Sequence, residues 1–239
     1  MLCKGMVIKM KRNNSILLYV VVIITLFVFA GCTAADVAGS ELVEKAREEY
    51  TKLNSAKVIM TNTETNEVEQ TFTFKYDEKD VLTFAYEGKY LDESYAQYNN
   101  GYECYTSENG EYTFNQRGDK DFQAYDRDST HPQANEGLII FSANAVEKSS
   151  VTEENGITCV EHRYDPEKIG ATSDEGDVTD FVARFYFNED KELLYFTEET
   201  VIDSDGDKIT HSYKVEITEK NAVEDIENPV EIPEDTLNP

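Results

Sequence analysis

Four apolar residues recur at i, i+4, i+8 and i+11 in the segment that follows residue 40: Leu42, Ala46, Tyr50 and Leu53. This spacing places them on one face of a helix. Ser40 precedes them, and serine is a residue type that caps helix N-termini. We therefore predict one amphipathic helix that begins near Ser40 and packs its apolar face on a core.

From residue 56 onward, apolar and polar residues alternate in short stretches, as they do in half-buried strands. The clearest pair flanks the polar turn at 77–80, with apolar positions at Phe72, Phe74 and Tyr76 before it and at Leu82, Phe84 and Tyr86 after it. Asn-Gly dipeptides at 100–101, 109–110 and 155–156 separate further stretches, and they supply the positive φ that tight hairpin turns need. The pattern predicts a series of antiparallel hairpins rather than βαβ units.

Three more strands are predicted in close succession at 181–187, 193–202 and 209–217. The region before them, residues 119–142, is less regular, and we expect one short helix near 134–141. Residues 229–239 contain prolines and are predicted to form a tail.

Residues 1–31 have the parts of a secretion signal. Four basic side chains lie between residues 4 and 12, and an apolar run of 15 residues extends from Ile16 to Ala30. Small residues before a cleavage point complete such a signal. A membrane-spanning helix needs about 20 apolar residues, so a signal peptide is favoured over a spanning helix.

The stretch Phe29-Ala30-Gly31-Cys32 resembles the lipobox of bacterial lipoproteins, with Phe29 where leucine is usual. The resemblance implies that the Cys32 thiol receives a diacylglyceryl group, that the signal is cut before Cys32, and that the new amino terminus is acylated. Two or three acyl chains anchor a protein stably, at about 0.8 kcal/mol per buried CH₂. The expected location is the extracytoplasmic face of the cell membrane. The alternative is an uncleaved helix that carries a cysteine by chance.

The chain after the signal is strongly acidic. Residues 32–239 hold all 48 acidic and 18 of the 22 basic side chains, a net charge near −30. Such a charge repels phosphate backbones and anionic headgroups. Nucleic acid is therefore excluded as a partner, and contact with the membrane is expected through the acyl chains on Cys32 alone. Residues 32–40 are small and polar, as a tether is.

One amphipathic helix, a run of antiparallel hairpins, an interrupting segment and a final meander together resemble the LolA-like lipoprotein-carrier family over residues 41–228. The resemblance implies a single α+β domain, in which a strongly curved antiparallel sheet, a half-barrel, packs on one or two helices and is preceded by the signal helix. Four stretches are also similar to lipoproteins of Gram-positive anaerobes: FTFKYDEKDVLTFAYEG, YNNGYECYTSENGEYTF, FYFNEDKELLYFTEET and ITEKNAVEDIENPVEIP.

Members of the carrier family hold acyl chains or act as sensors, so the resemblance implies a hydrophobic ligand such as a lipid. Six aromatic residues on the predicted apolar faces are candidates for either a ligand groove or a packed core: Phe72, Phe74, Phe84, Tyr86, Phe185 and Tyr213. A packed core is the more common role of such residues. The competing hypothesis is a non-enzymatic surface sensor or protein-interaction module with a filled core and an unknown protein partner.

Two cysteines remain after the signal and the lipidation site. Cys104 and Cys159 lie in predicted strands outside the reducing cytosol, where a disulfide could persist. Closing a loop of about 55 residues would contribute roughly 4 kcal/mol. The alternative is two buried thiols on strands that are not neighbours.

No motif in the sequence indicates catalysis or a cofactor. His131, His162 and His211 lie in separate segments without metal-ligand spacing, and the common zinc, nucleophile-elbow and phosphate-loop motifs are absent. We expect no enzyme activity, no catalytic residue and no cofactor. A hydrolase with dispersed residues is a minor alternative, and it would need one of these histidines beside a nucleophile.

The run at 203–207 has carboxylates at alternate positions, Asp203, Asp205 and Asp207, as some calcium loops do. A calcium-binding loop of the EF-hand type would require Gly at position 208 and Glu at position 214, and both are lysines. A hairpin turn is the favoured interpretation, and no metal is expected.

Overall fold

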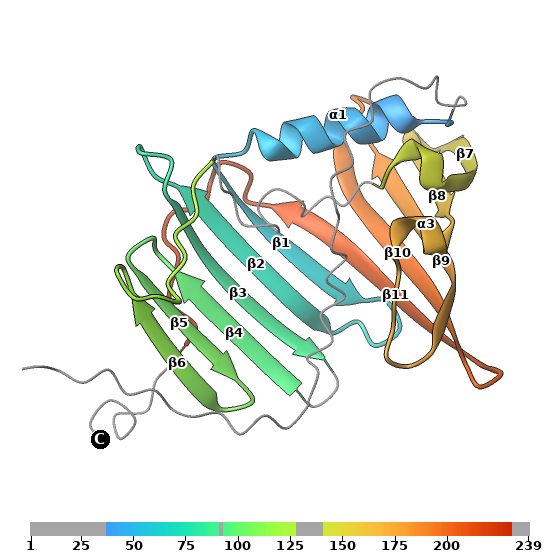
Figure 1. Cartoon of the computed structure of the whole chain (residues 1–239). Coiled ribbons are helices and arrows are strands. Elements are labelled where there is room, and N and C mark those ends of the chain that lie inside the picture. The colour runs from blue at the N-terminus through green and yellow to red at the C-terminus, as the bar shows by residue number, and fades with distance from the viewer. Residues whose placement is uncertain (1–36, 91–92, 128–140, 231–239) are drawn as a thin grey trace, which may run out of the picture.

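A computed structural model describes residues 37–90, 93–127 and 141–230 (Figure 1). The signal segment, the predicted lipobox with Cys32, most of the tether and most of the short helix expected at 134–141 lie outside the described residues. None of the helices in the described part is long and apolar enough to cross a membrane.

Eleven strands form one sheet in the order β6-β5-β4-β3-β2-β1-β11-β10-β9-β8-β7, and every pairing is antiparallel (Figure 1). The strands are β1 (Ser55–Asn62), β2 (Val68–Tyr76), β3 (Leu82–Tyr90), β4 (Glu93–Asn99), β5 (Glu103–Glu108), β6 (Glu111–Gln116), β7 (Val146–Glu154), β8 (Ile157–Tyr164), β9 (Asp177–Phe187), β10 (Leu193–Ser204) and β11 (Asp207–Thr218).

The chain builds this sheet as two meanders. Strands β1 to β6 run outward to one edge, residues 117–145 lead to the opposite edge, and β7 to β11 return until β11 pairs with β1. The predicted hairpins are confirmed: Phe72 is opposite Tyr86 and Phe74 is opposite Phe84. The Asn-Gly turns at 109–110 and 155–156 have positive φ at both residues, as two-residue hairpin turns require.

The fold class predicted from the sequence is wrong. We expected an α+β fold with a half-barrel packed on one or two helices, whereas the described residues form one open 11-stranded sheet with two short α-helices, α1 (Ser40–Thr51) and α3 (Pro166–Ile169), and the 3₁₀ turn η1 (Ala143–Ala145). The strands β6 and β7 remain as edges. The fold is therefore dominated by its sheet, because most of the chain after α1 alternates with a period of two.

Helix α1 is the amphipathic helix that the apolar spacing predicts. Its N-cap residue is Gly39, which has φ 76 and no side-chain capping hydrogen bond, and Ser40, expected as a cap, is instead the first residue of the helix. It lies across one end of the sheet (Figure 1). The helix buries Val43, Ala46 and Tyr50, and the Tyr50 ring meets the Phe74 ring edge-on at 6.0 Å between centroids.

The side of the sheet that carries α1 is called the core-facing side, and the opposite one the outer side. Successive residues of a strand point to opposite sides, so the buried aromatic and aliphatic residues of the core share one parity on each strand. The core joins both meanders through Phe72, Phe84, Phe185, Phe196 and Val215. Burying such side chains against one another stabilises the fold by roughly 1.5–3 kcal/mol each.

Candidate functional site

The six aromatic candidates separate into two groups. Five of them are buried in the core: Phe72, Phe74, Phe84, Tyr86 and Phe185. All five belong to one hydrophobic core cluster, in which Phe74 contacts Tyr50 of α1, so the packed-core interpretation applies to them. Tyr213 is only partly buried. It shares the core-facing side of β11 with buried Val215 but lies two residues nearer the start of that strand.

Tyr213 belongs to a polar cluster, formed with His162 and Glu198, on the core-facing side of β8 to β11. One register row runs across these strands through His162, Ala183, Glu198 and Tyr213. Phe196 and Ile202 are buried on the same side of β10 as Glu198. An acidic side chain therefore occupies a position in β10 that alternation assigns to the core.

The side chain of Glu198 is partly buried. Burial raises its pKa to about 7, because removing water disfavours the charged form. Within the described part of the chain, no side chain or backbone group donates a hydrogen bond to it. Burial raises the pKa of Tyr164 as well, and the negative charge of Glu198 adds to that effect. A carboxylate perturbed in this way marks a candidate functional position.

Two histidines lie in or beside the cluster: His162 is a member of the row, and His211 is next to Tyr213 on β11. The Nε2 atom of His211 lies 2.6 Å from a carboxylate oxygen of Glu175, and its ring stacks on Tyr213 at 12° between planes. The Nε2 atom of His162 lies 3.0 Å from the backbone oxygen of Ala38, and its Nδ1 atom lies 3.2 Å from the Tyr164 hydroxyl.

A neutral His162 satisfies both contacts, because Nε2–H donates to the carbonyl while Nδ1 accepts from the hydroxyl. Burial lowers the pKa of His162, although the backbone oxygen of Ala38 opposes that shift. The backbone N–H of Ala38 donates to Ser149. Neighbouring strands β7 and β8 therefore hold the residue that leads into α1, and no catalytic use of His162 follows from this arrangement.

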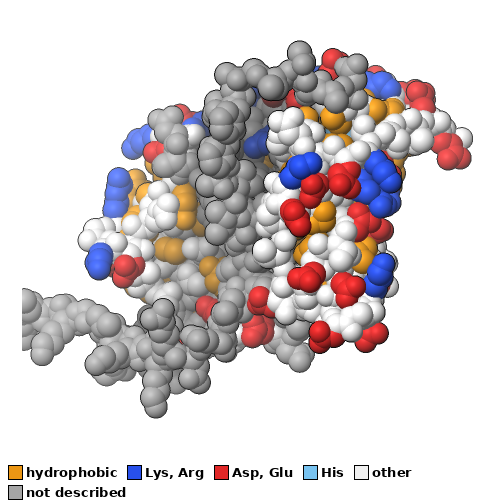
Figure 2. Space-filling view, turned by 45° about the vertical axis from the view of Figure 1, so that its right-hand side comes forward, with side chains coloured by type: hydrophobic (Ala, Val, Ile, Leu, Met, Phe, Trp, Pro, Cys, Tyr) orange, Lys and Arg blue, Asp and Glu red, His pale blue; other side chains and the backbone are white. Residues whose placement is uncertain are grey.

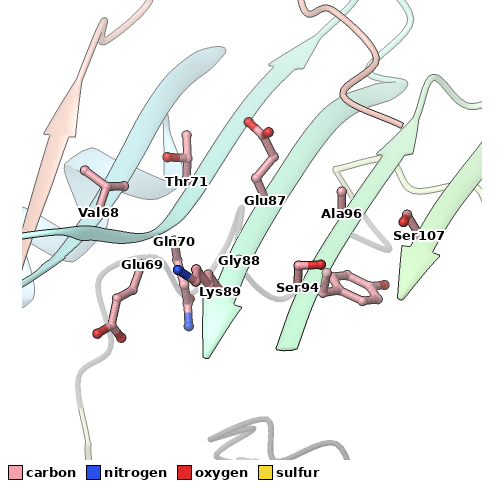
Figure 3. A pocket seen from close by; sticks show the side chains of 11 residues that line it. Val68, Glu69, Gln70, Thr71, Glu87, Gly88, Lys89, Ser94, Ala96 and Ser107 are labelled. Atoms are coloured by element: carbon pink, nitrogen blue, oxygen red, sulfur yellow. The ribbon is translucent and has the colours of Figure 1, made fainter. Parts of the chain in front are cut away.

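Two hollows differ in size and position. A small one of about 20 Å³ lies beside α1, between Val43, Phe141, Val146 and His162, which is room for about one water molecule. A larger one of about 370 Å³ lies at the ends of β2 to β5, and its lining is partly polar (Figure 3).

The disulfide considered from the sequence can be compared with the positions of its two cysteines. Cys104 on β5 and Cys159 on β8 are free thiols, and seven strands lie between them in the sheet. The disulfide considered for them is therefore not formed, since bridged Cα atoms lie within about 7 Å. His131 and the lipobox residues Phe29, Ala30, Gly31 and Cys32 lie outside the described residues.

The carboxylates at 203–207 belong to the β10–β11 hairpin. Ser204 pairs with Asp207, Asp205 and Gly206 both have positive φ, and Gly206 N–H donates to the Asp203 side chain at 2.8 Å. The run is thus a two-residue hairpin turn, as favoured from the sequence. Across the described ranges, no three acidic, histidine or cysteine side chains converge as a metal site would require.

Sequence reasoning missed Glu198 and the pairing of His211 with Glu175. A signal for Glu198 was present, because it interrupts the apolar phase of Phe196 and Ile202 on β10. No local signal indicates Glu175, since it lies in the loop before β9 and reaches His211 only through folding.

No protein-family model and no curated protein matches this chain. Among solved structures, the chain is similar to the crystal structure of LprF from Mycobacterium bovis, with 13% identity and a TM-score of 0.43, over 81% of this chain and 97% of that one. A TM-score of 0.43 does not establish a shared fold, so the function must be argued from the residues of this chain.

Proposed function

We propose that this protein is a lipid-anchored extracytoplasmic protein that holds a hydrophobic ligand, such as an acyl chain, on the core-facing side of its sheet. The observation that carries the proposal is the continuation of apolar side chains past α1. Met60, Tyr95 and Tyr213 face that side and are only partly buried. Glu198 lies opposite Tyr213 on the neighbouring strand, and burial raises its pKa.

Hydrophobic side chains are visible in several patches between polar and charged ones on the face shown in Figure 2. Ligand pockets are typically apolar with a few placed polar groups. An acyl chain would contact the tyrosines and Met60, and a neutral polar group at its end would lie beside Glu198. The anchor itself is supported by the lipobox resemblance at Cys32 and by the acidity of the rest of the chain.

The test uses unacylated protein purified without detergent. Native mass spectrometry should detect retained or added fatty acid, and a fluorescent fatty acid should bind saturably. Met60→Gln should weaken binding about tenfold, since it places an amide against the acyl chain. Ile59→Gln is the matched control, because Ile59 directly precedes Met60 in β1 and its side chain points to the outer side. Absence of bound lipid, or equal weakening by both changes, would contradict the proposal.

A second candidate function is a surface sensor or protein-interaction module. The packing under α1 favours it, because the hollow there holds only about 20 Å³. If no lipid binds and an acidic surface recruits a basic protein partner in a salt-dependent way, this second function is the better account.

A further inference from the structure

The outer side of β4, β5 and β6 carries a row of three aromatic rings in register: Tyr98, Tyr105 and Phe114. Their centroids are 6.3 Å and 4.9 Å apart. Tyr98 precedes Asn99, whose side chain is buried and donates to the Gln123 carbonyl on the core-facing side, so Tyr98 points outward. Phe114 is 42% exposed, and the two tyrosines are partly exposed.

The hollow of about 370 Å³ lies beside this aromatic row. The next register row on the outer side consists of Thr71, Glu87, Ala96 and Ser107, and all four line the hollow. Figure 3 shows these four side chains one after another across neighbouring strands. Ala96 and Ser107 have short side chains, whereas their neighbours in the aromatic row, Tyr98 and Tyr105, carry rings.

The polar side chains around the hollow carry hydroxyls, carboxylates, the amide of Gln70 and one ammonium. Thr71, Ser94 and Ser107 supply hydroxyls, Glu69 and Glu87 supply carboxylates, and Lys89 is the single cation of the lining. These groups accept and donate hydrogen bonds at several points. Their net negative charge, in a chain of net charge −26, opposes the binding of an anion.

We propose that the aromatic row and the adjacent hollow form a binding face for uncharged oligosaccharides. Such a ligand has an apolar C–H face on each sugar ring and a rim of hydroxyl groups. The C–H faces would pack on the rings of Tyr98, Tyr105 and Phe114, which bury large apolar area at low entropic cost. The rim would donate to Glu87 and exchange hydrogen bonds with Thr71 and Ser107. The Tyr105 hydroxyl already donates to Glu103 at 3.2 Å, which restrains that ring.

Most of this face lies on the other side of the sheet from the proposed lipid site. The aromatic row and the row Thr71, Glu87, Ala96 and Ser107 lie on the outer side, whereas Met60, Tyr213 and Glu198 lie on the core-facing side. Core-facing Tyr95 also lines the hollow, so the two sites adjoin at the start of β4. A protein anchored at its amino terminus outside the cytoplasm could thus hold a glycan and a hydrophobic ligand at the same time.

The test measures binding of cellohexaose, xylohexaose and maltohexaose to the full chain in nanodiscs by isothermal titration calorimetry, with empty nanodiscs as the blank. At least one of the three should bind saturably. Tyr105→Ala and Phe114→Ala should each raise its Kd about tenfold through lost ring contact. Tyr102→Ala is the matched control, because Tyr102 is a 53% exposed tyrosine in the turn before β5 and should leave Kd unchanged.

A second variant fills the hollow without removing a ring. Ala96→Leu should weaken binding by a similar factor, and thermal unfolding of each variant verifies that it folds. Hexagalacturonate, a charged oligosaccharide, should not bind. The proposal is overturned if none of the three uncharged hexasaccharides binds, if Tyr102→Ala weakens binding as much as Phe114→Ala, or if hexagalacturonate binds as well as they do.

Discussion

At the scale of single residues, burial shifts the pKa values of Glu198 and His162 in opposite directions. It raises the pKa of the acid to about 7 and lowers that of the base, and in both cases it favours the neutral form. Both residues lie in one register row on the core-facing side. The row is therefore least charged in mildly acidic to neutral solution, where we expect the proposed hydrophobic ligand to bind most tightly.

We expect Glu198→Gln to stabilise the protein at pH 8. The folded pKa of Glu198 is raised, so its favourable contribution is present below its unfolded pKa and is lost as pH rises through about 7. Glutamine mimics the protonated form and should increase the free energy of unfolding by about 1–3 kcal/mol at pH 8, with no increase at pH 4. Urea unfolding of both proteins across this range measures the difference.

Glu199→Gln is the control for that experiment. Glu199 is the next residue of β10, and its carboxylate faces the outer side, 3.6 Å from the Arg184 guanidinium. Its removal should slightly destabilise the protein at pH 8, by up to about 1 kcal/mol for a pair exposed in this way. A Glu198→Gln effect that does not vary with pH would show that the carboxylate is well hydrated.

At the scale of elements, α1 and the residues just before it contact strands of both meanders. Its first turn lies against β7 and β8, where a Cβ on Gly39 would lie 2.6 Å from Val160. Its last turn meets β2 through Tyr50 and Phe74. One helix therefore contacts strands from both meanders, which makes its docking a long-range contribution to stability.

Tyr50→Ala should lower the free energy of unfolding by about 3–5 kcal/mol, because it leaves a cavity where a 2% exposed ring packs. Glu44→Ala, on the exposed face of the same helix, should change it by less than about 0.5 kcal/mol. Thermal or urea unfolding measures both. A similar small loss for the two variants would mean that α1 is not docked on the sheet in solution.

At the scale of the whole molecule, charge and attachment are linked. The residues after the predicted signal carry a net charge near −30, so the body of the protein is repelled by an anionic membrane surface. Ser149 and His162 hold Ala38 against the sheet, six residues after Cys32 in the sequence. We expect a short tether between the anchor and the fold.

Cys32→Ala should abolish both acylation and signal cleavage, so the precursor should keep its full mass and incorporate no labelled palmitate. Immunoblotting of membrane fractions with palmitate labelling measures both effects. Cys3→Ala changes the same residue type within the predicted signal and should leave maturation intact. Normal cleavage and labelling of Cys32→Ala would refute the predicted lipidation site.

Much of the strand arrangement was predictable, because alternation and hairpin turns depend on neighbouring residues. The pairing of Phe74 with Phe84 follows from a turn at 77–80, and the Asn-Gly turns follow from the positive φ that these residues tolerate. The fold class was not predicted correctly, since it depends on how many strands join one sheet. The candidate site was predicted only at Tyr213.

The sequence by itself determined the helix that begins near residue 40, the hairpins and the acidity, because these depend on local period, local turn chemistry and charge. The lipid anchor at Cys32 stays a prediction from the lipobox resemblance. Only the tertiary structure decided that β1 pairs with β11, that Cys104 and Cys159 lie far apart, and that His211 meets Glu175. Those contacts join residues distant along the chain, and packing of the whole core selects them over the alternatives that local pattern allows.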